Sequence, residues 1–162
     1  RVDWNFKRPA DFSTGYFGEA ENTRLPDALR DSVEMVPIST KVRNTDWMAQ
    51  VNRFNCHYAV RHDREIDGFK PFIKGFTAAH AGANIIIQRS AGDAVFYLGE
   101  DYPFLIDGEA GPNEIANVWQ QAKDSFSTSV WRDALEIMKE VEFRSSINFI
   151  INEFRYILKE VG

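Results

Sequence analysis

The sequence lacks several features that would identify a class of protein at once. It contains a single cysteine, Cys56, in 162 residues. One cysteine excludes an internal disulfide and a metal site made of several cysteines, and it fits a reducing compartment. No segment approaches the roughly 18 consecutive apolar residues of a membrane-spanning helix. The formal net charge is -5, without the basic excess of a nucleic-acid-binding surface. We therefore expect neither a transmembrane segment nor a nucleic-acid partner.

Signatures of catalytic and cofactor sites are missing as well. The segment GYFG at 15–18 is not the GxGxxG fingerprint of dinucleotide binding. No serine, histidine and aspartate, and no cysteine and histidine, are spaced as in a nucleophilic site, and no metal-ligand spacing occurs. We therefore expect no metal and no cofactor. His62 could act as a base, but beside Asp63 in a charged loop it is better interpreted as a solvated side chain.

What the sequence does contain is a regular alternation of short apolar segments with helical patterns. A short apolar run is typical of a buried strand, whereas apolar spacing of three and four is typical of an amphipathic helix. This alternation predicts an α/β fold with a parallel sheet of about five strands and helices on both faces. The predicted strands are 14–18, 33–38, 56–61, 84–87 and 102–106, and the predicted helices between them are 21–32, 46–54, 71–81 and 94–98.

After residue 108 the pattern becomes purely helical. Pro112 starts one amphipathic helix, Ser127 or Thr128 caps a second, and Ser145 or Ser146 opens a third. We expect this order to give residues 1–13 as a linker or leading arm, residues 14–108 as the sheet domain, and residues 109–162 as C-terminal helices that pack on the same domain.

The segment 71–81 carries the clearest local signals. Pro71 suits the first helical position, where its missing N–H costs nothing, and Gly82 suits the end of the helix. The helical spacing predicts an inward face made of Ile73, Phe76, Thr77, His80 and Ala81.

Three cationic residues gather where a ligand of such a sheet would bind. Open parallel α/β sheets bind ligands at the carboxyl ends of their strands. Arg61 ends the third predicted strand, and Lys70 and Lys74 stand at the start of the next helix. Free N–H groups near Phe72 and Ile73 would add the positive end of the helix dipole. Because lysines at a helix start oppose the dipole unless an anion binds, we predict a phosphate or diphosphate site; the alternative is two solvated surface lysines.

A glycine adjoins the same edge of the predicted sheet. Gly18 ends the first predicted strand and would let a ligand approach the backbone closely. The alternative is an ordinary turn at the end of a strand.

Three segments together resemble a known family. The segments GYFG, FKPFIKGFTAAHAGANIII and AVFYLGEDYPFLI, followed by paired C-terminal helices, resemble the C-terminal, donor-binding half of GT-B-fold glycosyltransferases. The resemblance covers roughly 14–162, and its most specific part, 70–87, is similar to the KPxxKxxxAxxxGxxxI pattern of some bacterial sugar transferases. It implies a Rossmann-like domain that binds a nucleoside-diphosphate sugar without a metal ion. The donor-binding residues that it implies are Gly18, Arg61, Lys70, Lys74 and Thr77.

The sequence departs from this family at two positions. Many retaining members carry two glutamates around this helix, for the donor sugar and the ribose, where this chain has Phe69 and Thr77. Thr77 could supply only a hydroxyl, so the resemblance does not support that retaining chemistry here and leaves the catalytic residues unknown. It also implies an upstream acceptor-binding domain or subunit, without which we expect this chain to be inactive. The implied location is the cytoplasm, with the inner membrane face as an alternative.

Two other classes of function fit parts of the pattern. A flavodoxin-like regulatory module, such as a response-regulator receiver, would suit the length and strand count. It would require clustered acids after the first strand, where Glu19 is a partial match, and an aspartate at the end of the third strand, where Asp63 lies two residues past Arg61. It would also require a lysine after the fifth strand, where this chain has Asp107. A non-catalytic interaction module that keeps the fold without the ligand is the other alternative.

Overall fold

The structure, a computed structural model, describes residues 9–38, 46–62 and 70–161. Its centre is a five-stranded sheet in which every neighbouring pair is parallel, with strand order β2-β1-β3-β4-β5. The predicted α/β fold with a parallel sheet is therefore confirmed. The strands are β1 Thr14–Phe17, β2 Val33–Val36, β3 Cys56–Tyr58, β4 Asn84–Gln88 and β5 Leu105–Ile106.

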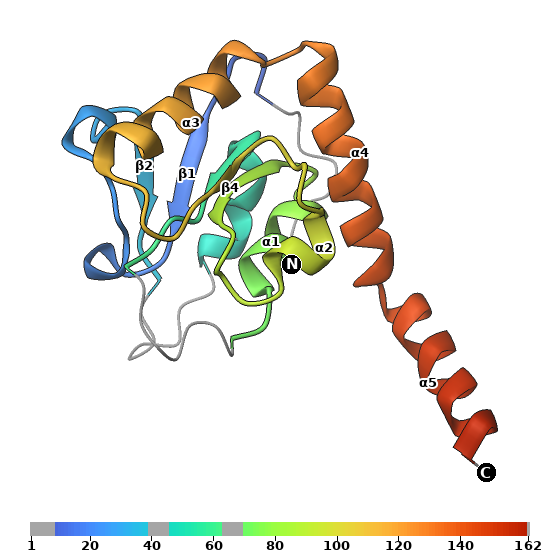
Figure 1. The fold of residues 1–162 in the computed structure, drawn as a ribbon. Helices are drawn as coiled ribbons and strands as arrows, with labels where there is room; N and C mark the ends of the chain where they lie inside the picture. Colours follow the sequence, from blue (N-terminus) through green and yellow to red (C-terminus); the bar gives the residue numbers. More distant parts are fainter. Residues whose placement is uncertain (1–8, 39–45, 63–69, 162) are drawn as a thin grey trace.

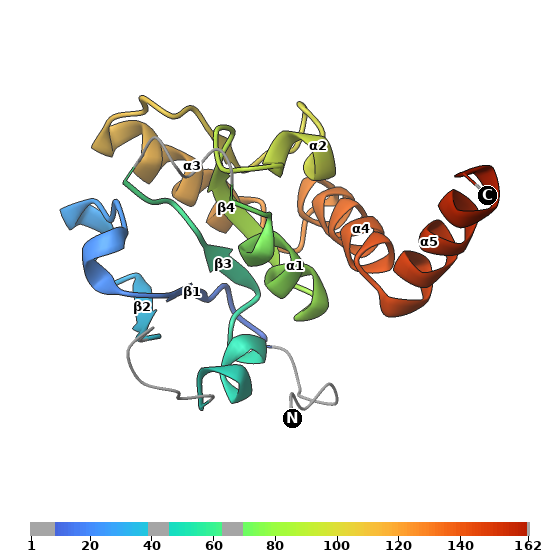
Figure 2. The ribbon, with the colours of Figure 1, turned by 90° about the horizontal axis from the view of Figure 1, so that it is seen from below.

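Helices cover both faces of this sheet. In this strand order, right-handed crossovers place the β3-to-β4 and β4-to-β5 connections on one face of the sheet. They place the β1-to-β2 connection on the opposite face. Figure 2 shows α1 on one side of the strands and α3 on the opposite side. Thr128 caps α4, as predicted, because its hydroxyl accepts a hydrogen bond from the backbone N–H of Trp131. The helices are α1 Ile73–His80, α2 Ala94–Leu98, α3 Pro112–Asp124, α4 Ser129–Arg144 and α5 Ile147–Val161.

The core is built around the middle of the sheet. The Ile85 and Ile86 side chains of β4 are fully buried, as expected for a strand covered on both faces. Trp131 of α4 packs on Phe104 at a ring-centroid distance of 5.7 Å. The amide of Asn84 donates to the carbonyl of Trp131 at 3.2 Å, so α4 is joined to the sheet by a polar contact as well as by packing.

Two predicted helices are wrong. The segment 21–32 forms two short 3-10 turns, Ala20–Asn22 and Asp27–Leu29. Pro26 lies between them and cannot donate the backbone hydrogen bond that a continuous helix would need there. The segment 46–54 is likewise two 3-10 turns, Asp46–Ala49 and Val51–Arg53.

Helix α1 starts later and faces the other way from the prediction. It begins at Ile73 rather than Pro71, and Ile73 is 62% exposed. The residues that it buries are Gly75, Ala78 and Ala79. A methyl group on Gly75 would come within 1.9 Å of the Phe72 ring, so only small residues allow this close approach. The predicted inward face was therefore wrong, because size rather than hydropathy selects the packed side.

The two ends of the chain are attached to the domain in different ways. The described end of the leading arm belongs to the domain, because the ring of Phe12 packs on Trp119 and Trp131 and the backbone N–H of Ser13 donates to Asn55. At the other end, α3 and α4 contribute residues such as Trp119 and Trp131 to the core. Helix α5 does not, since no residue of Ile147–Val161 is buried. Figure 1 shows α5 extending away from the remaining helices and strands.

Candidate functional site

A cavity with a volume of about 290 Å³ lies at the carboxyl ends of β3 and β4, beside the start of α1. This is the edge where open parallel sheets bind their ligands. Ala59 and Arg61 approach the cavity from β3, Ile87 and Gln88 from β4. The remaining lining comes from the entry to α1 and the loop after β4, namely Lys70, Pro71, Phe72, Ile73, Lys74, Ser90, Ala91 and Gly92.

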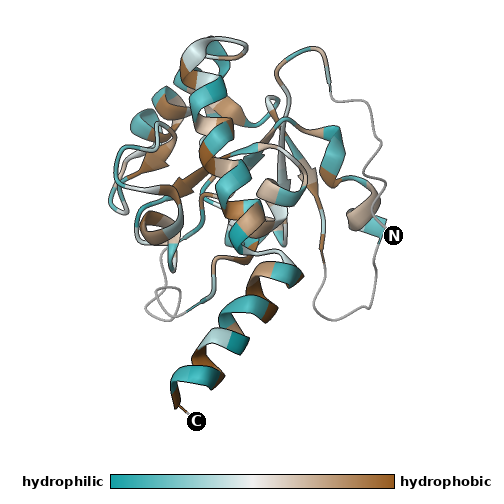
Figure 3. Ribbon diagram, turned by 90° about the vertical axis from the view of Figure 1, so that its right-hand side faces the viewer, coloured by the Kyte–Doolittle hydropathy of each residue, from teal (hydrophilic) through white to brown (hydrophobic). Residues whose placement is uncertain are grey.

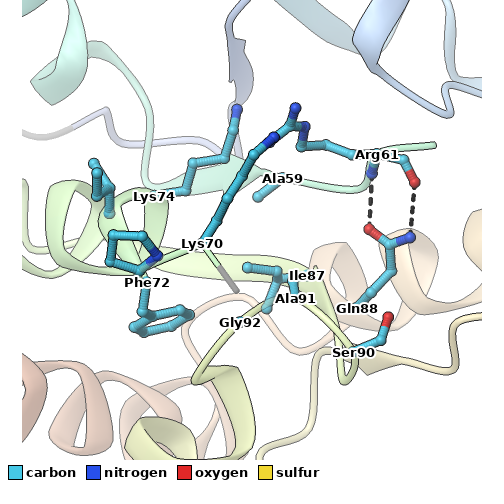
Figure 4. Close-up of a pocket in the computed structure, with 12 residues that line it drawn as sticks. Ala59, Arg61, Lys70, Phe72, Lys74, Ile87, Gln88, Ser90, Ala91 and Gly92 are labelled. Atoms are coloured by element: carbon cyan, nitrogen blue, oxygen red, sulfur yellow. Dashed lines mark hydrogen bonds between the residues drawn. The ribbon is translucent and has the colours of Figure 1, made fainter. Parts of the chain in front are cut away.

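Three of the predicted site residues line this cavity together. Figure 4 shows the cationic ends of Arg61, Lys70 and Lys74 converging on one side of it. The Nζ of Lys74 donates to the carbonyl of Phe17 at 2.6 Å and lies 4.2 Å from the centre of the Tyr16 ring. Lys74 thus bridges from α1 to the end of β1 and is not a solvated surface lysine.

The environment of Lys74 disfavours its charge. Burial, and secondly the positive charge of Arg61, lower the pKa of Lys74 from its ordinary value to about 7. In the described residues no carboxylate is paired with Lys74 or Arg61. Among the described residues, these two neighbouring cations therefore have no negative charge paired with them, an arrangement that favours the binding of an anion.

Gln88 holds Arg61 in place. Its side-chain carbonyl accepts from the backbone N–H of Arg61 at 2.8 Å, and its amide donates to the Arg61 carbonyl at 2.7 Å (Figure 4). The Nε of Arg61 is buried and has no hydrogen-bond partner in the described part of the chain. A buried donor without a partner costs free energy, so this N–H is poised to bond an acceptor that the described residues do not supply.

The sequence analysis missed Gln88. No motif marks a glutamine, yet Gln88 directly follows the apolar run Ile85–Ile87 and is only 2% exposed. A polar side chain at the carboxyl end of a buried strand must find hydrogen-bond partners there. Its place directly after a buried apolar run could therefore have marked Gln88 as a candidate site residue from the sequence alone.

Two predicted site residues, Gly18 and Thr77, lie outside this cavity. Gly18 has φ +155°, and a methyl group there would lie 2.9 Å from the hydroxyl oxygen of Tyr16. Thr77 lines a second cavity of about 190 Å³, which shares Ala59, Ile73 and Lys74 with the first. This second cavity is almost entirely apolar, and it is lined by Phe17, Ile38, Trp47, His57, Tyr58, Ala59, Ile73, Lys74 and Thr77.

The start of α1 offers fewer free backbone N–H groups than predicted. The N–H of Ile73 was expected to be free, but it donates to the carbonyl of Pro71 at 2.7 Å. No side chain caps the helix at Phe72. The cationic side chains, rather than this N–H, are therefore the main donors facing the first cavity.

The histidines do not form a catalytic arrangement in the described residues. His57 is buried, its Nε2–H donates to the carbonyl of Val51 at 3.0 Å, and burial lowers its pKa to about 4. His62 is exposed, in line with a solvated loop residue. His80 lies next to the hydroxyl of Ser145 at 3.2 Å, far along α1 from the cavity. His57 is thus uncharged at neutral pH, its one ring proton is bonded to Val51, and it can shape the second cavity without acting as an acid there.

Searches for a metal centre and a membrane span gave nothing in the described ranges. No three histidine, cysteine or acidic side chains there are grouped as metal ligands. No helix in those ranges has both the length and the hydropathy required to cross a bilayer.

A scan against protein-family models and a search of curated protein sequences gave no match. Solved structures did match in fold. A glycosyltransferase from Rickettsia africae ESF-5 superposes with a TM-score of 0.64 at 10% identity, covering 94% of this chain and 48% of that chain. WaaG, a glycosyltransferase involved in lipopolysaccharide biosynthesis, superposes with a TM-score of 0.54 at 10% identity, covering 91% of this chain and 46% of that chain.

These matches concern one domain of larger proteins. This chain spans about half the length of each of the two glycosyltransferases. It has the Rossmann-like fold of one domain of a GT-B glycosyltransferase, so the resemblance seen in the sequence is confirmed at the level of the fold.

Proposed function

We propose that this chain is the donor-binding domain of a glycosyltransferase and that its first cavity takes the diphosphate of a nucleoside-diphosphate sugar. The observation that carries the proposal is the convergence of Arg61, Lys70 and Lys74 on one cavity at the carboxyl edge of the sheet. A diphosphate would supply the negative charge that the described surroundings of Arg61 and Lys74 lack, and an acceptor for the buried Arg61 Nε–H. In glycosyl transfer the same cations would stabilise the leaving diphosphate.

The second cavity suits the nucleoside of the same donor. It adjoins the first cavity across Lys74, so a single ligand can lie in both. Its apolar and aromatic lining, with Trp47 and Phe17, suits a flat base. The hydroxyl of Thr77 donates to the carbonyl of Ile73 at 2.9 Å, which leaves only its acceptor lone pairs for a ribose hydroxyl. Gly18 contributes indirectly, since it follows Phe17, the residue whose carbonyl binds Lys74.

The proposal includes a partner. The acceptor-binding side of the reaction would come from an upstream domain or subunit, and we expect the 162-residue chain alone to bind the donor without transferring the sugar.

Thermal-shift titration with nucleotides tests the proposal. Wild type, Lys74→Ala and the surface control Lys139→Ala would be titrated with UDP, GDP, ADP, CMP, TDP and inorganic pyrophosphate. We expect one nucleoside diphosphate to raise the Tm of wild type and of the control, and this shift to be lost in Lys74→Ala. Circular dichroism would verify that Lys74→Ala is folded. Absence of a shift with every ligand in the folded wild type would contradict donor binding and favour the non-catalytic interaction module.

A regulatory receiver is the second candidate, because the strand order β2-β1-β3-β4-β5 is also that of flavodoxin-like modules. The lysine that a receiver needs after β5 is replaced by Asp107, which pairs with Arg89 at 3.2 Å. Asp63, the residue that would be phosphorylated, lies outside the described residues. Incubation with acetyl phosphate distinguishes the two, since a receiver would gain the mass of a phosphoryl group and a donor-binding domain would not.

A further inference from the structure

Lys74 places an amino group on the walls of both cavities, in surroundings that disfavour a positive charge. Its Nζ lies 2.6 Å from the carbonyl oxygen of Phe17 and 4.2 Å from the centre of the Tyr16 ring. Figure 4 shows the ends of Arg61 and Lys70 close to it, and Figure 3 shows hydrophobic strands, coloured brown, at the centre of the molecule. An ammonium group that is half removed from water beside a guanidinium loses hydration and is repelled by its neighbour.

The groups around Lys74 do not offset this cost. No described ion pair includes Lys74 or Arg61. Burial raises the pKa of the Tyr16 and Tyr58 hydroxyls, so neither forms a phenolate at neutral pH. His57 is uncharged at neutral pH, and the positive charge of Lys74 helps to lower its pKa. The titratable and charged groups on the neighbouring segments are Tyr16, Glu19 and Glu21 at and after β1, His57, Tyr58 and Arg61 at and after β3, and Lys70 before α1.

A bound diphosphate would reverse this balance. Burial and Arg61 lower the pKa of Lys74 to about 7, so most of the chains carry a neutral amine there above that pH. Negative charge brought into the first cavity favours the ammonium form, because an opposite charge within a few ångströms raises the pKa of an amine. Linkage makes the effect reciprocal: if the anion increases the affinity of Lys74 for a proton, the proton increases the affinity of the site for the anion.

We propose that binding of the donor's diphosphate is coupled to the uptake of one proton by the amino group of Lys74, so that donor affinity falls as the pH rises above 7. The proton comes from solvent and joins the lone pair of Nζ. The resulting ammonium group has enough N–H donors to keep its bond to the Phe17 carbonyl and to bond a phosphate oxygen as well. This inference rests on the proposed donor site and adds a control of that site by pH.

Calorimetric titration of the full chain tests the coupling. The probes are UDP-glucose, GDP-mannose, ADP-glucose and TDP-glucose, whose diphosphates are esterified at both ends and do not titrate between pH 6 and 8.5. Binding heats measured in buffers with different ionisation enthalpies give the number of protons taken up, and Kd is measured from pH 6 to 8.5. Lys74→Arg keeps a positive charge throughout this range, Lys74→Met removes it, and Lys139→Arg is the control at an exposed position. Circular dichroism would verify that each variant is folded.

We expect wild type and Lys139→Arg to take up about one proton per bound sugar nucleotide at pH 8.5 and almost none at pH 6. Their Kd should increase about tenfold between pH 7.5 and 8.5. Lys74→Arg should take up no proton at either pH, and so should Lys74→Met if it still binds. Wild type that binds without proton uptake at pH 8.5, or an equal uptake by Lys74→Arg, would overturn the coupling and leave the donor site intact. Absence of binding by folded wild type at pH 6 with all four probes would overturn the donor site and the coupling together.

Discussion

At the scale of single residues, Lys74 combines two opposing effects. Its partly buried position brings it to Arg61 and the cavity, but burial and Arg61 lower its pKa from 10.5 to about 7. Between pH 7 and 10.5 the unfolded chain therefore holds a proton at this residue that the folded chain does not. Stability consequently rises with pH across this window, and the full cost of the charged lysine is present below pH 7. A lysine that destabilises the folded chain is expected in a binding site, whereas a purely structural contact would not retain it.

We predict that Lys74→Met stabilises the folded chain most below pH 7 and progressively less toward pH 10. The expected gain in the free energy of unfolding at pH 6, reduced by the lost bond to Phe17 and by solvent screening, is on the order of 2 kcal/mol. Urea denaturation of wild type and variant at pH 6, 7.5 and 9 measures it. Lys139→Met, at an exposed position, serves as the control. If the free energy of unfolding had the same pH dependence in wild type and Lys74→Met, a lowered pKa of Lys74 in the folded chain would be contradicted.

The residues of the site differ in how far the sequence could predict them. Arg61, Lys70 and Lys74 were predictable because charge at the carboxyl ends of strands and at a helix start stands out along the chain. The role of Gln88 was not predictable, since it depends on the strand register that brings Gln88, at the end of β4, beside Arg61, which lies three residues past β3. The placement of Thr77 was also missed. Thr77 lies three residues after Lys74 in the same helix, and that spacing does not predict which of the two cavities its side chain lines.

At the scale of elements, the sequence predicted the sheet better than the helices. Apolar runs such as Ile85–Ile87 can only be buried, so each predicted strand exists and its position was close. Helical periodicity over 21–32 was outweighed by one proline, and the periodicity of α1 indicated the wrong face. Helix α1 lies close to α4, and the residues that it buries include the small Ala78 and Ala79, whereas the bulkier Ile73 stays exposed.

This reversal of α1 can be tested by mutation. We predict that Ala79→Leu destabilises the chain by about 2–3 kcal/mol, because added methylene groups have no space in a packed interface. By contrast, Ile73→Ala should change the free energy of unfolding by only about 0.5 kcal/mol, because the side chain is 62% exposed. Chemical denaturation at one pH compares the two variants with wild type. A larger loss of stability in Ile73→Ala than in Ala79→Leu would instead show that α1 buries the face predicted from the sequence.

At the scale of the whole molecule, the chain consists of a closed domain and a projecting helix. The core runs from Phe12, packed on Trp119, to Val141 of α4, and it includes no residue of α5. The described residues that line the two cavities likewise all lie between Phe17 and Gly92. Folding and ligand binding should therefore be separable from whatever α5 contacts.

Removal of α5 tests this separation. We predict that a chain ending at Ser146 folds with a Tm within about 3 °C of the dilute full-length chain, since no residue of α5 is buried and only Phe149 is half-buried. Its Tm shift with the nucleotide that stabilises the full-length chain should be unchanged. Unfolding of the shortened chain would show that α5 belongs to the domain, and a lost nucleotide shift in a folded shortened chain would show that α5 supports the site.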